Sequence, residues 1–199
     1  MKQKGTLIVI SGPSGSGKGT VVNILKKNSA YALSISATTR SPRPGEIDGV
    51  HYFFKTEDEF KEMIDKKQLL EWARFCGNFY GTPKDYVVGK LEEGHDVILE
   101  IEVQGASQIK SIFPEAVTVF LVPPCKEELR RRLEGRATEE QSVIENRLMR
   151  ASEEIELLPK YDYVVVNDKL EDAVESVNNI VKVSKLLSSR YTCLIEEFK

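Results

Sequence analysis

The sequence predicts an α/β fold in which a mostly parallel sheet is flanked by helices. Short runs of Val, Ile and Leu alternate with segments of helical periodicity, and a glycine-rich turn follows the first run. Continuous apolar strands separated by helices are typical of parallel sheets that are buried on both faces. The length of 199 residues suits one domain, and 41% hydrophobic residues suffice for a core.

Each of four apolar runs is expected to form a strand, and each is followed by a segment with apolar residues at helical spacing. The expected strands are Leu7–Ser11, Val97–Ile101, Val117–Val122 and Tyr163–Val166. The expected helices are Lys18–Lys27, Gly105–Ile112, Lys126–Leu133 and Leu170–Leu187.

Two regions interrupt this alternation. Residues 34–96 are richer in Gly, Pro, Tyr and Thr and contain short β-like pieces such as Val50–Phe54, which indicates an inserted subdomain. Residues 135–158 contain a capping box, Thr138 to Gln141, followed by apolar residues at helical spacing. We therefore expect a core that carries two insertions.

Charge and cysteine content exclude several classes of protein. The 31 acidic and 28 basic residues give a net charge of −3, which argues against binding nucleic acid through bulk positive charge. No apolar segment approaches the roughly 20 residues that a membrane helix needs. The cysteines are scattered and the two histidines lie far apart, so we expect reduced thiols, no Cys/His metal site and a cytoplasmic protein.

The most specific local pattern is a glycine-rich loop between the first strand and the first helix, Gly12-Pro13-Ser14-Gly15-Ser16-Gly17-Lys18. Glycines let the backbone turn so that successive N–H groups point inward, and the following helix presents its positive end to an anion. Lys18 adds a charge for the β- and γ-phosphates. The loop predicts binding of ATP or another nucleoside triphosphate; the alternative is a glycine-rich turn with an incidental lysine.

The residue after the lysine departs from the usual pattern. Gly19 stands where Ser or Thr normally offers a hydroxyl to Mg²⁺. Thr20, one residue later, can approach a phosphate instead. We therefore expect Mg²⁺, the cofactor that accompanies ATP, to be held largely through water.

The first inserted region carries a second set of candidates for binding an anion. Arg40 and Arg43 lie beside hydroxyls within the segment Ser36–Tyr52, and guanidinium groups make paired, charge-assisted hydrogen bonds to phosphate. A solvated polar loop explains this segment equally well when it is taken alone. Further along the chain come Glu71-Trp72-Ala73 and Gly77-Asn78-Phe79-Tyr80-Gly81-Thr82.

Taken together, these motifs resemble those of guanylate kinases. The matching pieces are Gly12–Lys18, Thr38-Thr39-Arg40-x-Pro42-Arg43-x-Gly45-Glu46, Glu71-Trp72, Gly77-Asn78-x-Tyr80-Gly81, Leu99-Glu100-Ile101-Glu102-x-Gln104-Gly105, Arg132-Leu133-x-Gly135-Arg136 and Val166-Asn167-Asp168. They span nearly the whole chain in the order of the family, which makes the combination far more specific than any one motif. The resemblance implies the reaction ATP + GMP → ADP + GDP, with ATP and GMP as partners.

The resemblance also implies how a single domain is organised. A P-loop NTPase core would comprise about residues 1–33, 97–129 and 159–199, a GMP-binding subdomain about residues 34–96, and a helical lid about residues 130–158. Gly12–Lys18 would bind ATP together with Gly19, Thr20 and Asn167. The residues implied in GMP binding are Arg40, Arg43, Tyr52 and Tyr80 for the phosphate, Ser36, Glu71, Thr82 and Glu100 for guanine, and Glu46 beside them.

The chemistry of guanine agrees with these assignments. Guanine presents N–H donors that a carboxylate at Glu71 can accept, and acceptors that the hydroxyls of Ser36 and Thr82 can reach. Adenine has an acceptor at N1, so in such a site it would leave buried polar groups unsatisfied. A structural salt bridge is the alternative role for Glu71.

Two glutamates lie at the end of the second apolar run. Glu100 and Glu102 are two residues apart, so in a strand their side chains return to one face. We expect Glu100 to bind the guanine amine, and Glu102 to contact Lys18 or to hold Mg²⁺ through water. Many relatives carry aspartate at one or both positions, so the carboxylates here extend further from the backbone by one methylene. The alternative is a pair of surface glutamates.

Six arginines and no lysine fall within residues 130–150. Phosphoryl transfer needs positive charge aimed at the transferring group, and the resemblance implies that Arg132, Arg136 and Arg147 supply it together with Lys18. The other three arginines, Arg130, Arg131 and Arg150, match less specifically and are expected at the surface. Ala137 stands where the family usually has glycine, which is expected to stiffen or shift lid closure.

Two alternatives to an active guanylate kinase stay open. One is a non-catalytic binding module of the same shape, which the retained loop and lid arginines disfavour. The other is a kinase for another nucleoside monophosphate, which Glu71 disfavours. The sequence is compatible with a monomer or a homodimer, and the partly apolar tail Tyr191–Lys199 is expected to pack on the core or at a subunit contact.

Overall fold

The computed structural model describes residues 4–75, 77–135 and 141–199, which form two sheets. The larger sheet has five parallel strands in the order β2-β7-β1-β8-β9. Its strands are β1 (Leu7–Ser11), β2 (Tyr31–Leu33), β7 (Asp96–Glu100), β8 (Val117–Val122) and β9 (Tyr163–Val166). This sheet confirms the α/β fold that the alternating apolar runs predict.

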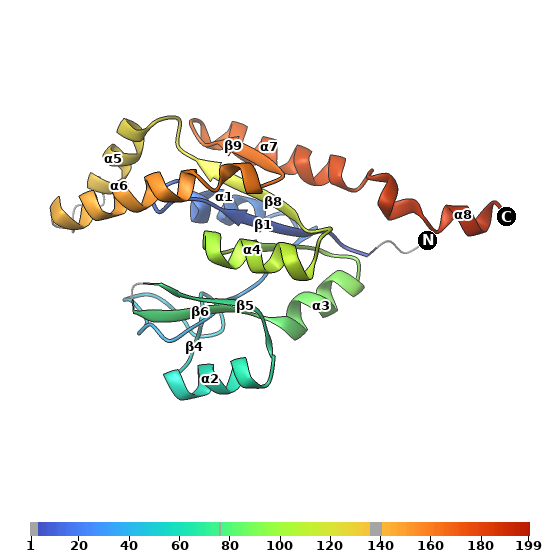
Figure 1. Cartoon of the computed structure of the whole chain (residues 1–199), viewed down its shortest axis with the longest axis horizontal. Coiled ribbons are helices and arrows are strands. Elements are labelled where there is room, and N and C mark those ends of the chain that lie inside the picture. Colours follow the sequence, from blue (N-terminus) through green and yellow to red (C-terminus); the bar gives the residue numbers. More distant parts are fainter. Residues whose placement is uncertain (1–3, 76, 136–140) are drawn as a thin grey trace.

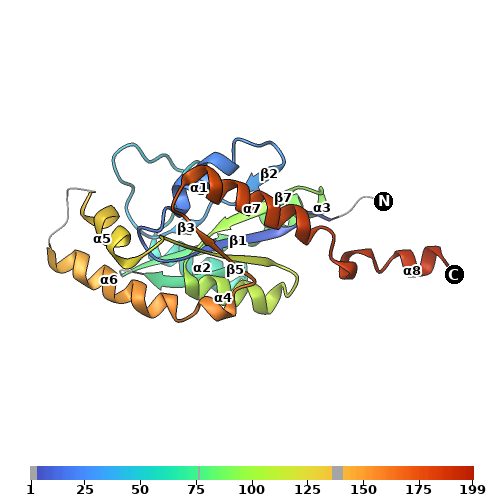
Figure 2. The same cartoon turned by 90° about the horizontal axis from the view of Figure 1, so that it is seen from above.

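Helices cover both faces of the larger sheet (Figures 1 and 2). Alternate residues of β1 point to opposite faces, so all five are buried. Ile8 and Ile10 pack with α1 (Lys18–Leu25) and α7 (Leu170–Ser184), whereas Leu7 and Val9 pack with α3 (Lys84–Glu92) and α4 (Val103–Ile112). No helix in the described ranges is both long and apolar enough to cross a membrane.

The smaller sheet has the order β4-β3-β6-β5 and lies beyond α4 (Figure 1). Its elements are β3 (Ala37–Thr38), β4 (Phe53–Phe54), β5 (Leu69–Phe75), β6 (Asn78–Pro83) and the helix α2 (Glu57–Asp65). A capping box begins α2, because Thr56 and Glu59 each accept a hydrogen bond from the backbone N–H of the other. Gln108 of α4 joins the sheets by bonding both the carbonyl and the N–H of Trp72, at 2.7 and 3.2 Å.

The helices α5 (Lys126–Glu134) and α6 (Gln141–Ile155) pack on each other through an apolar cluster of their own. Its members are Leu129, Leu133, Ile144, Leu148 and Ala151. The capping box expected at Thr138 lies outside the described residues. After α6 come the short helices η1 (Leu158–Lys160), η2 (Ser188–Tyr191) and α8 (Leu194–Glu197), the last two in the C-terminal tail.

Several expected boundaries were wrong by a few residues. Helix α4 begins at Val103 rather than Gly105, and α7 ends at Ser184 rather than Leu187. Helix α1 ends at Leu25 rather than Lys27. The N–H of Lys27 donates to the carbonyl of Ile24, three residues earlier, which is the hydrogen bond of a tighter 3₁₀ turn. Of the β-like piece Val50–Phe54 only the last two residues form a strand, because a turn precedes them.

Phe60 anchors α2 on the smaller sheet, and its loss should be costly. The ring is fully buried and stacks on Phe79 with 5.4 Å between ring centroids. We expect Phe60→Ala to lower the free energy of unfolding by about 3–5 kcal/mol, because a large buried cavity is left. Urea denaturation measures the loss. The exposed Tyr86→Ala on α3 serves as the control, and equal losses in both variants would contradict the role of Phe60.

Candidate active site

The glycine-rich loop leaves the carboxyl end of β1 and runs into α1. Gly12, Gly15 and Gly17 all have positive φ angles, of 144°, 91° and 91°. A Cβ atom on Gly12 would lie 2.1 Å from the carbonyl oxygen of Leu121 on the neighbouring strand. The loop therefore depends on glycine both for its backbone conformation and for its close approach to β8.

Lys18 and Thr20 lie at the start of α1, where the helix presents its N–H groups. The Nζ atom of Lys18 donates to the carbonyls of Gly12 and Pro13, the latter at 3.3 Å, so the ammonium group stays over the loop. Thr20 is exposed on the first turn. A Cβ atom on Gly19 would lie 3.4 Å from Oε1 of Glu100, so a carboxylate adjoins the position that usually carries a hydroxyl.

Asn167 and Arg132 support the loop from behind. The side-chain amide of Asn167, which is buried, donates to the carbonyl of Ser16 at 2.8 Å. Gly17 leaves room for that amide, since a Cβ there would lie 2.4 Å from Nδ2. Arg132 donates to the carbonyls of Asn167 and Ser16, at 2.8 and 3.4 Å. Both side chains thus contact the loop backbone, and the contacts that the resemblance implies, of Asn167 with adenine and of Arg132 with the transferring phosphate, stay predictions.

Glu128 fixes the orientation of Arg132. One carboxylate oxygen accepts from Nε of Arg132 at 2.7 Å, and Arg131 bonds both oxygens, also at 2.7 Å. The guanidinium groups of Arg131 and Arg132 lower the pKa of Glu128 to about 2. Arg131 is largely exposed, as the sequence predicts, and Arg130 pairs with Glu145 on the surface of α6.

A cavity of about 190 Å³ lies between the smaller sheet and the end of β7. It brings together most of the residues implied in GMP binding, namely Ser36, Arg40, Arg43, Tyr52, Glu71, Tyr80 and Glu100, together with Glu102. Ala73, Phe75, Gly81 and Ile101 complete the lining and were not anticipated from the sequence. Their positions follow from strand pairing, which no local motif encodes.

Glu71 is the most deeply buried acid in this cavity, with 4% of the residue exposed. Its Oε1 accepts a hydrogen bond of 2.6 Å from the hydroxyl of Thr82, which is itself fully buried. Burial raises the pKa of Glu71 to about 7, against the lowering effect of the Thr82 hydrogen bond. On α4, a Cβ at Gly105 would lie 2.2 Å from Oε2, so only glycine lets the helix pass this carboxylate.

Glu46 holds the arginine loop together. Its carboxylate pairs with Arg40 at 2.9 Å and accepts from the backbone N–H of Arg43 at 2.7 Å. The guanidinium group of Arg40 lies 5.4 Å from the ring centroid of Tyr52, whose ring packs edge-on to that of Tyr80. Glu46 is thus placed to support the arginines, and the two tyrosines line the same cavity.

Glu100 and Glu102 both line the cavity, but they belong to different elements and do not lie on one strand as expected. Strand β7 ends at Glu100, and Glu102 is the N-cap residue of α4, so strand alternation does not relate them. The Glu102 side chain makes no capping hydrogen bond to its helix. Partial burial among the surrounding protein atoms raises the pKa of Glu100, although the residue still has surface in contact with solvent. The positive charge of Lys18 lowers the pKa and so opposes this effect.

The residues present fit a magnesium ion held through water. Mg²⁺ usually binds one or two carboxylates, phosphate oxygens and several waters rather than a full cage of protein ligands. Among the described residues no group of three or more His, Cys, Asp or Glu side chains could enclose a metal. The carboxylate of Glu100 adjoins Gly19 at the phosphate loop, which is the donor type and place that such an ion needs.

Two residues of α6 reach the site and were missed or misplaced by sequence reasoning. Arg150, expected at the surface, lies with its guanidinium carbon 4.4 Å from the ring centroid of Phe75 in the cavity wall. Glu154 is buried, and both burial and Glu102 raise its pKa, against the effect of Lys18. Arg147 is half-buried on α6, and Arg136 and Ala137 lie outside the described residues.

The parallel sheet, the glycine loop before α1 and the adjoining acidic and basic cavity define a P-loop protein of the nucleotide-binding α/β class. A family model described as guanylate kinase matches residues 4–184. The guanylate kinase of Halalkalibacterium halodurans is 52% identical over 198 residues, which are 99% of this chain and 96% of that protein. The guanylate kinase of Bacillus cereus strain ZK / E33L is 58% identical over 181 residues, 90% and 88% of the two chains.

A solved structure agrees with the sequence relatives. The crystal structure of guanylate kinase from Anaplasma phagocytophilum is similar with a TM-score of 0.80 and 33% identity, over 95% of this chain and 90% of that one. The protein belongs to the guanylate kinase family, as the sequence motifs predict.

The raised pKa of Glu71 should make stability depend on pH. The folded-state pKa of about 7 lies above the ordinary value of 4.5, so the stabilising contribution is complete below about pH 4.5 and is lost as the pH rises through 7. Over this range the unmodified protein should lose up to about 3 kcal/mol relative to Glu71→Gln. Urea denaturation at a series of pH values measures the difference.

A matched variant controls for general effects of charge. Glu175→Gln removes an exposed carboxylate on α7 and should leave this pH trend as it is in the unmodified protein. A constant stability difference between Glu71→Gln and the unmodified protein from pH 4.5 to 7 would show that Glu71 ionises normally.

Proposed function

We propose that the protein transfers the γ-phosphoryl group of ATP to the phosphate of GMP, giving ADP and GDP. The observation that carries the proposal is the cavity that combines the buried carboxylate of Glu71 with the guanidinium groups of Arg40 and Arg43. A carboxylate that accepts from guanine and a pair of arginines for a phosphate suit one ligand, guanosine monophosphate. Membership of the guanylate kinase family supports the same reaction.

Guanine recognition in this proposal rests on Glu71 with Thr82 behind it. The Thr82 hydroxyl donates to Glu71 and so orients the carboxylate, and the contact of Thr82 with guanine stays part of the proposal. Ser36 lines the cavity and Glu100 lies at its edge, which supports their contact with the base. Because the site offers a carboxylate to the N1 position, the N–H of guanine is matched and the lone pair of adenine is not.

The transfer itself needs no nucleophilic side chain. An oxygen of the GMP phosphate forms a bond to the γ-phosphorus of ATP while the bond to the bridging oxygen of ADP breaks. The loop N–H groups and Lys18 hold the ATP phosphates, and Arg132, Arg136 and Arg147 complete the positive charge around the transferring group. Mg²⁺ bound with ATP supplies further positive charge at its phosphates, and Glu102 with Glu100 would hold the ion through water.

Closure around the two nucleotides is part of the proposal. Residues 34–96 would move as the GMP-binding subdomain and residues 130–158 as the lid, and closure would exclude water that could otherwise accept the phosphoryl group. The separate apolar cluster of α5 and α6 supports movement of the lid as a unit. Arg150 of the lid contacts Phe75 of the GMP-binding subdomain, which supports a direct mechanical coupling between the movements of these two parts.

The expected location of this reaction is the cytoplasm. ATP and GMP are the proposed partners, and the free, exposed thiol of Cys125 supports a reducing compartment.

Measurement of ADP release with a panel of acceptors tests the proposed reaction. With ATP and Mg²⁺ present, GMP should be turned over at least tenfold more efficiently, by kcat/KM, than AMP, CMP, UMP or dTMP. The absence of turnover with every acceptor would favour a non-catalytic binding module. Best turnover with AMP would overturn the assignment of the cavity to guanine.

Glu71→Gln should separate recognition of GMP from binding of ATP. The amide keeps the volume but presents N–H donors where guanine also donates, so KM for GMP should rise by roughly 10- to 100-fold. KM for ATP should change less than twofold, since the phosphate loop is untouched. Steady-state kinetics measure both constants, and Glu175→Gln is the matched control. An equal rise in both KM values would count against a specific role in binding guanine.

A further inference from the structure

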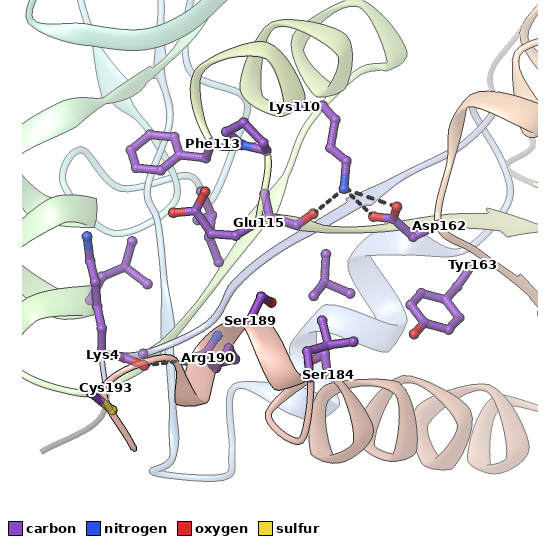
Figure 3. A pocket seen from close by; sticks show the side chains of 17 residues that line it. Lys4, Lys110, Phe113, Glu115, Asp162, Tyr163, Ser184, Ser189, Arg190 and Cys193 are labelled. Atoms are coloured by element: carbon purple, nitrogen blue, oxygen red, sulfur yellow. Dashed lines mark hydrogen bonds and ion pairs between the residues drawn. The ribbon is translucent and has the colours of Figure 1, made fainter. Parts of the chain in front are cut away.

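A cavity of about 840 Å³ lies at the end of the large sheet opposite the phosphate loop, where β1, β8 and β9 begin (Figure 3). Among its described lining residues none belongs to α5 or α6, and the charges of Lys110 and Asp162 are paired within it at 2.7 Å. The smaller cavity of about 190 Å³ differs, because an arginine of α6 packs on a residue of its wall. At this contact the proposed lid reaches the proposed binding site for GMP.

The arginine is Arg150, and the wall residue is Phe75. The guanidinium carbon of Arg150 lies 4.4 Å from the centroid of the Phe75 ring. A guanidinium group over the face of an aromatic ring is attracted by the negative potential of that face, and removal from water strengthens the attraction. Both residues are half-buried, so the contact is stronger than one at a fully exposed site.

Phe75 carries the contact into the cavity. It is the last residue of β5 and points to the same side as Glu71 and Ala73, because side chains two residues apart in a strand share a face. All three line the cavity. The ring of Phe75 meets that of Tyr80 on β6 edge-on, with 6.3 Å between centroids and an interplanar angle of 78°. Phe75 therefore joins α6 to a tyrosine that the proposed function places at the phosphate of GMP.

Ring contacts continue from Tyr80 to the arginine loop. The rings of Tyr80 and Tyr52 also pack edge-on, with 6.2 Å between centroids, and the guanidinium carbon of Arg40 lies 5.4 Å from the Tyr52 centroid. Edge-to-face pairs of this kind favour one relative orientation of the two rings. The orientation of Phe75 is thus passed to the side chains at the phosphate end of the cavity.

Arg150 lies on the face of α6 that is turned toward the site. Arg147, Arg150 and Glu154 are three and four residues apart, so they share one face of the helix. Burial and the charge of Glu102 raise the pKa of Glu154, whereas the charges of Lys18 and then Arg150 lower it. A contact that fixes Arg150 also fixes the rotation of α6, and with it the direction in which Arg147 projects.

We propose that Arg150 is a positioning residue for the acceptor nucleotide and acts through Phe75 rather than by touching the nucleotide. The stack on Phe75 orients Tyr80 in the cavity wall and holds α6 against the smaller sheet. Less ordering is then needed when the nucleotide binds, which increases its affinity. The inference rests on the proposed function, because GMP is the ligand assigned to this cavity.

Calorimetric titration with GMP alone tests the inference without requiring catalysis. Arg150→Met keeps an unbranched apolar side chain but removes the charge, and Phe75→Leu keeps apolar bulk but removes the ring. Each should raise the dissociation constant of GMP about fivefold, as expected for loss of a partly buried cation–π contact. The double variant should bind only slightly more weakly than either single variant, because both remove the same contact. Phe75→Tyr keeps a ring and should bind GMP within about twofold of the unmodified protein.

Arg74→Met is the matched control. Arg74 is exposed on the opposite face of β5, where its guanidinium carbon lies 5.6 Å from the ring centroid of Phe79. The control therefore removes a contact of the same kind that faces away from the cavity, and it should bind GMP like the unmodified protein. In steady-state kinetics Arg150→Met should raise KM for GMP about fivefold and change KM for ATP less than about twofold. Circular dichroism spectra of all variants should match that of the unmodified protein, which shows that they fold.

The outcomes separate the inference from the function on which it rests. An unmodified protein that neither binds nor phosphorylates GMP would overturn both. If the unmodified protein does both and Arg150→Met binds GMP equally tightly, the inference alone fails. Losses that multiply in the double variant would show that Arg150 and Phe75 act independently, as expected if Arg150 touched the nucleotide itself, and would also overturn the inference. An equal loss in Arg74→Met would do the same.

Discussion

The packing of α4 against β5 is the constraint on which the arrangement of the site depends. Gly105 lets the helix pass Glu71, and Gln108 clamps the backbone of Trp72. The other side of the same helix places Ala106 and Ile109 in the core beneath the large sheet. One helix therefore fixes the distance between the sheets, buries the carboxylate of Glu71 at the base of the cavity, and has Glu102 as its N-cap residue.

The phosphate loop is held by residues that belong to different parts of the chain. Asn167 follows the last strand of the large sheet, and Arg132 lies on α5, yet both donate to the carbonyl of Ser16. Arg132 also bonds the carbonyl of Asn167, which ties the loop, the strand end and the base of the lid into one hydrogen-bonded unit. A change in the position of α5 would therefore move the backbone of the glycine-rich loop directly.

The sequence predicted those features whose signals lie within a few consecutive residues. The parallel strands and the loop before α1 are of this kind, because apolar runs and glycine spacing encode them locally. Glu102 was misread because strand alternation was extended across a strand end into a helix cap. The contacts of Thr82 with Glu71 and of Arg150 with Phe75 join residues distant in sequence, so only the pairing of strands and the packing of α6 create them.

The burial of Glu71 has a consequence for how a ligand enters. With a pKa of about 7, the carboxylate holds a proton in a sizeable fraction of molecules at neutral pH. In the proposed reaction guanine offers N–H donors there, so it would bind to the ionised form and displace that proton. Entry of the nucleotide and departure of a proton would then be one linked event. The heat of binding then includes the ionisation of whichever buffer takes up the proton.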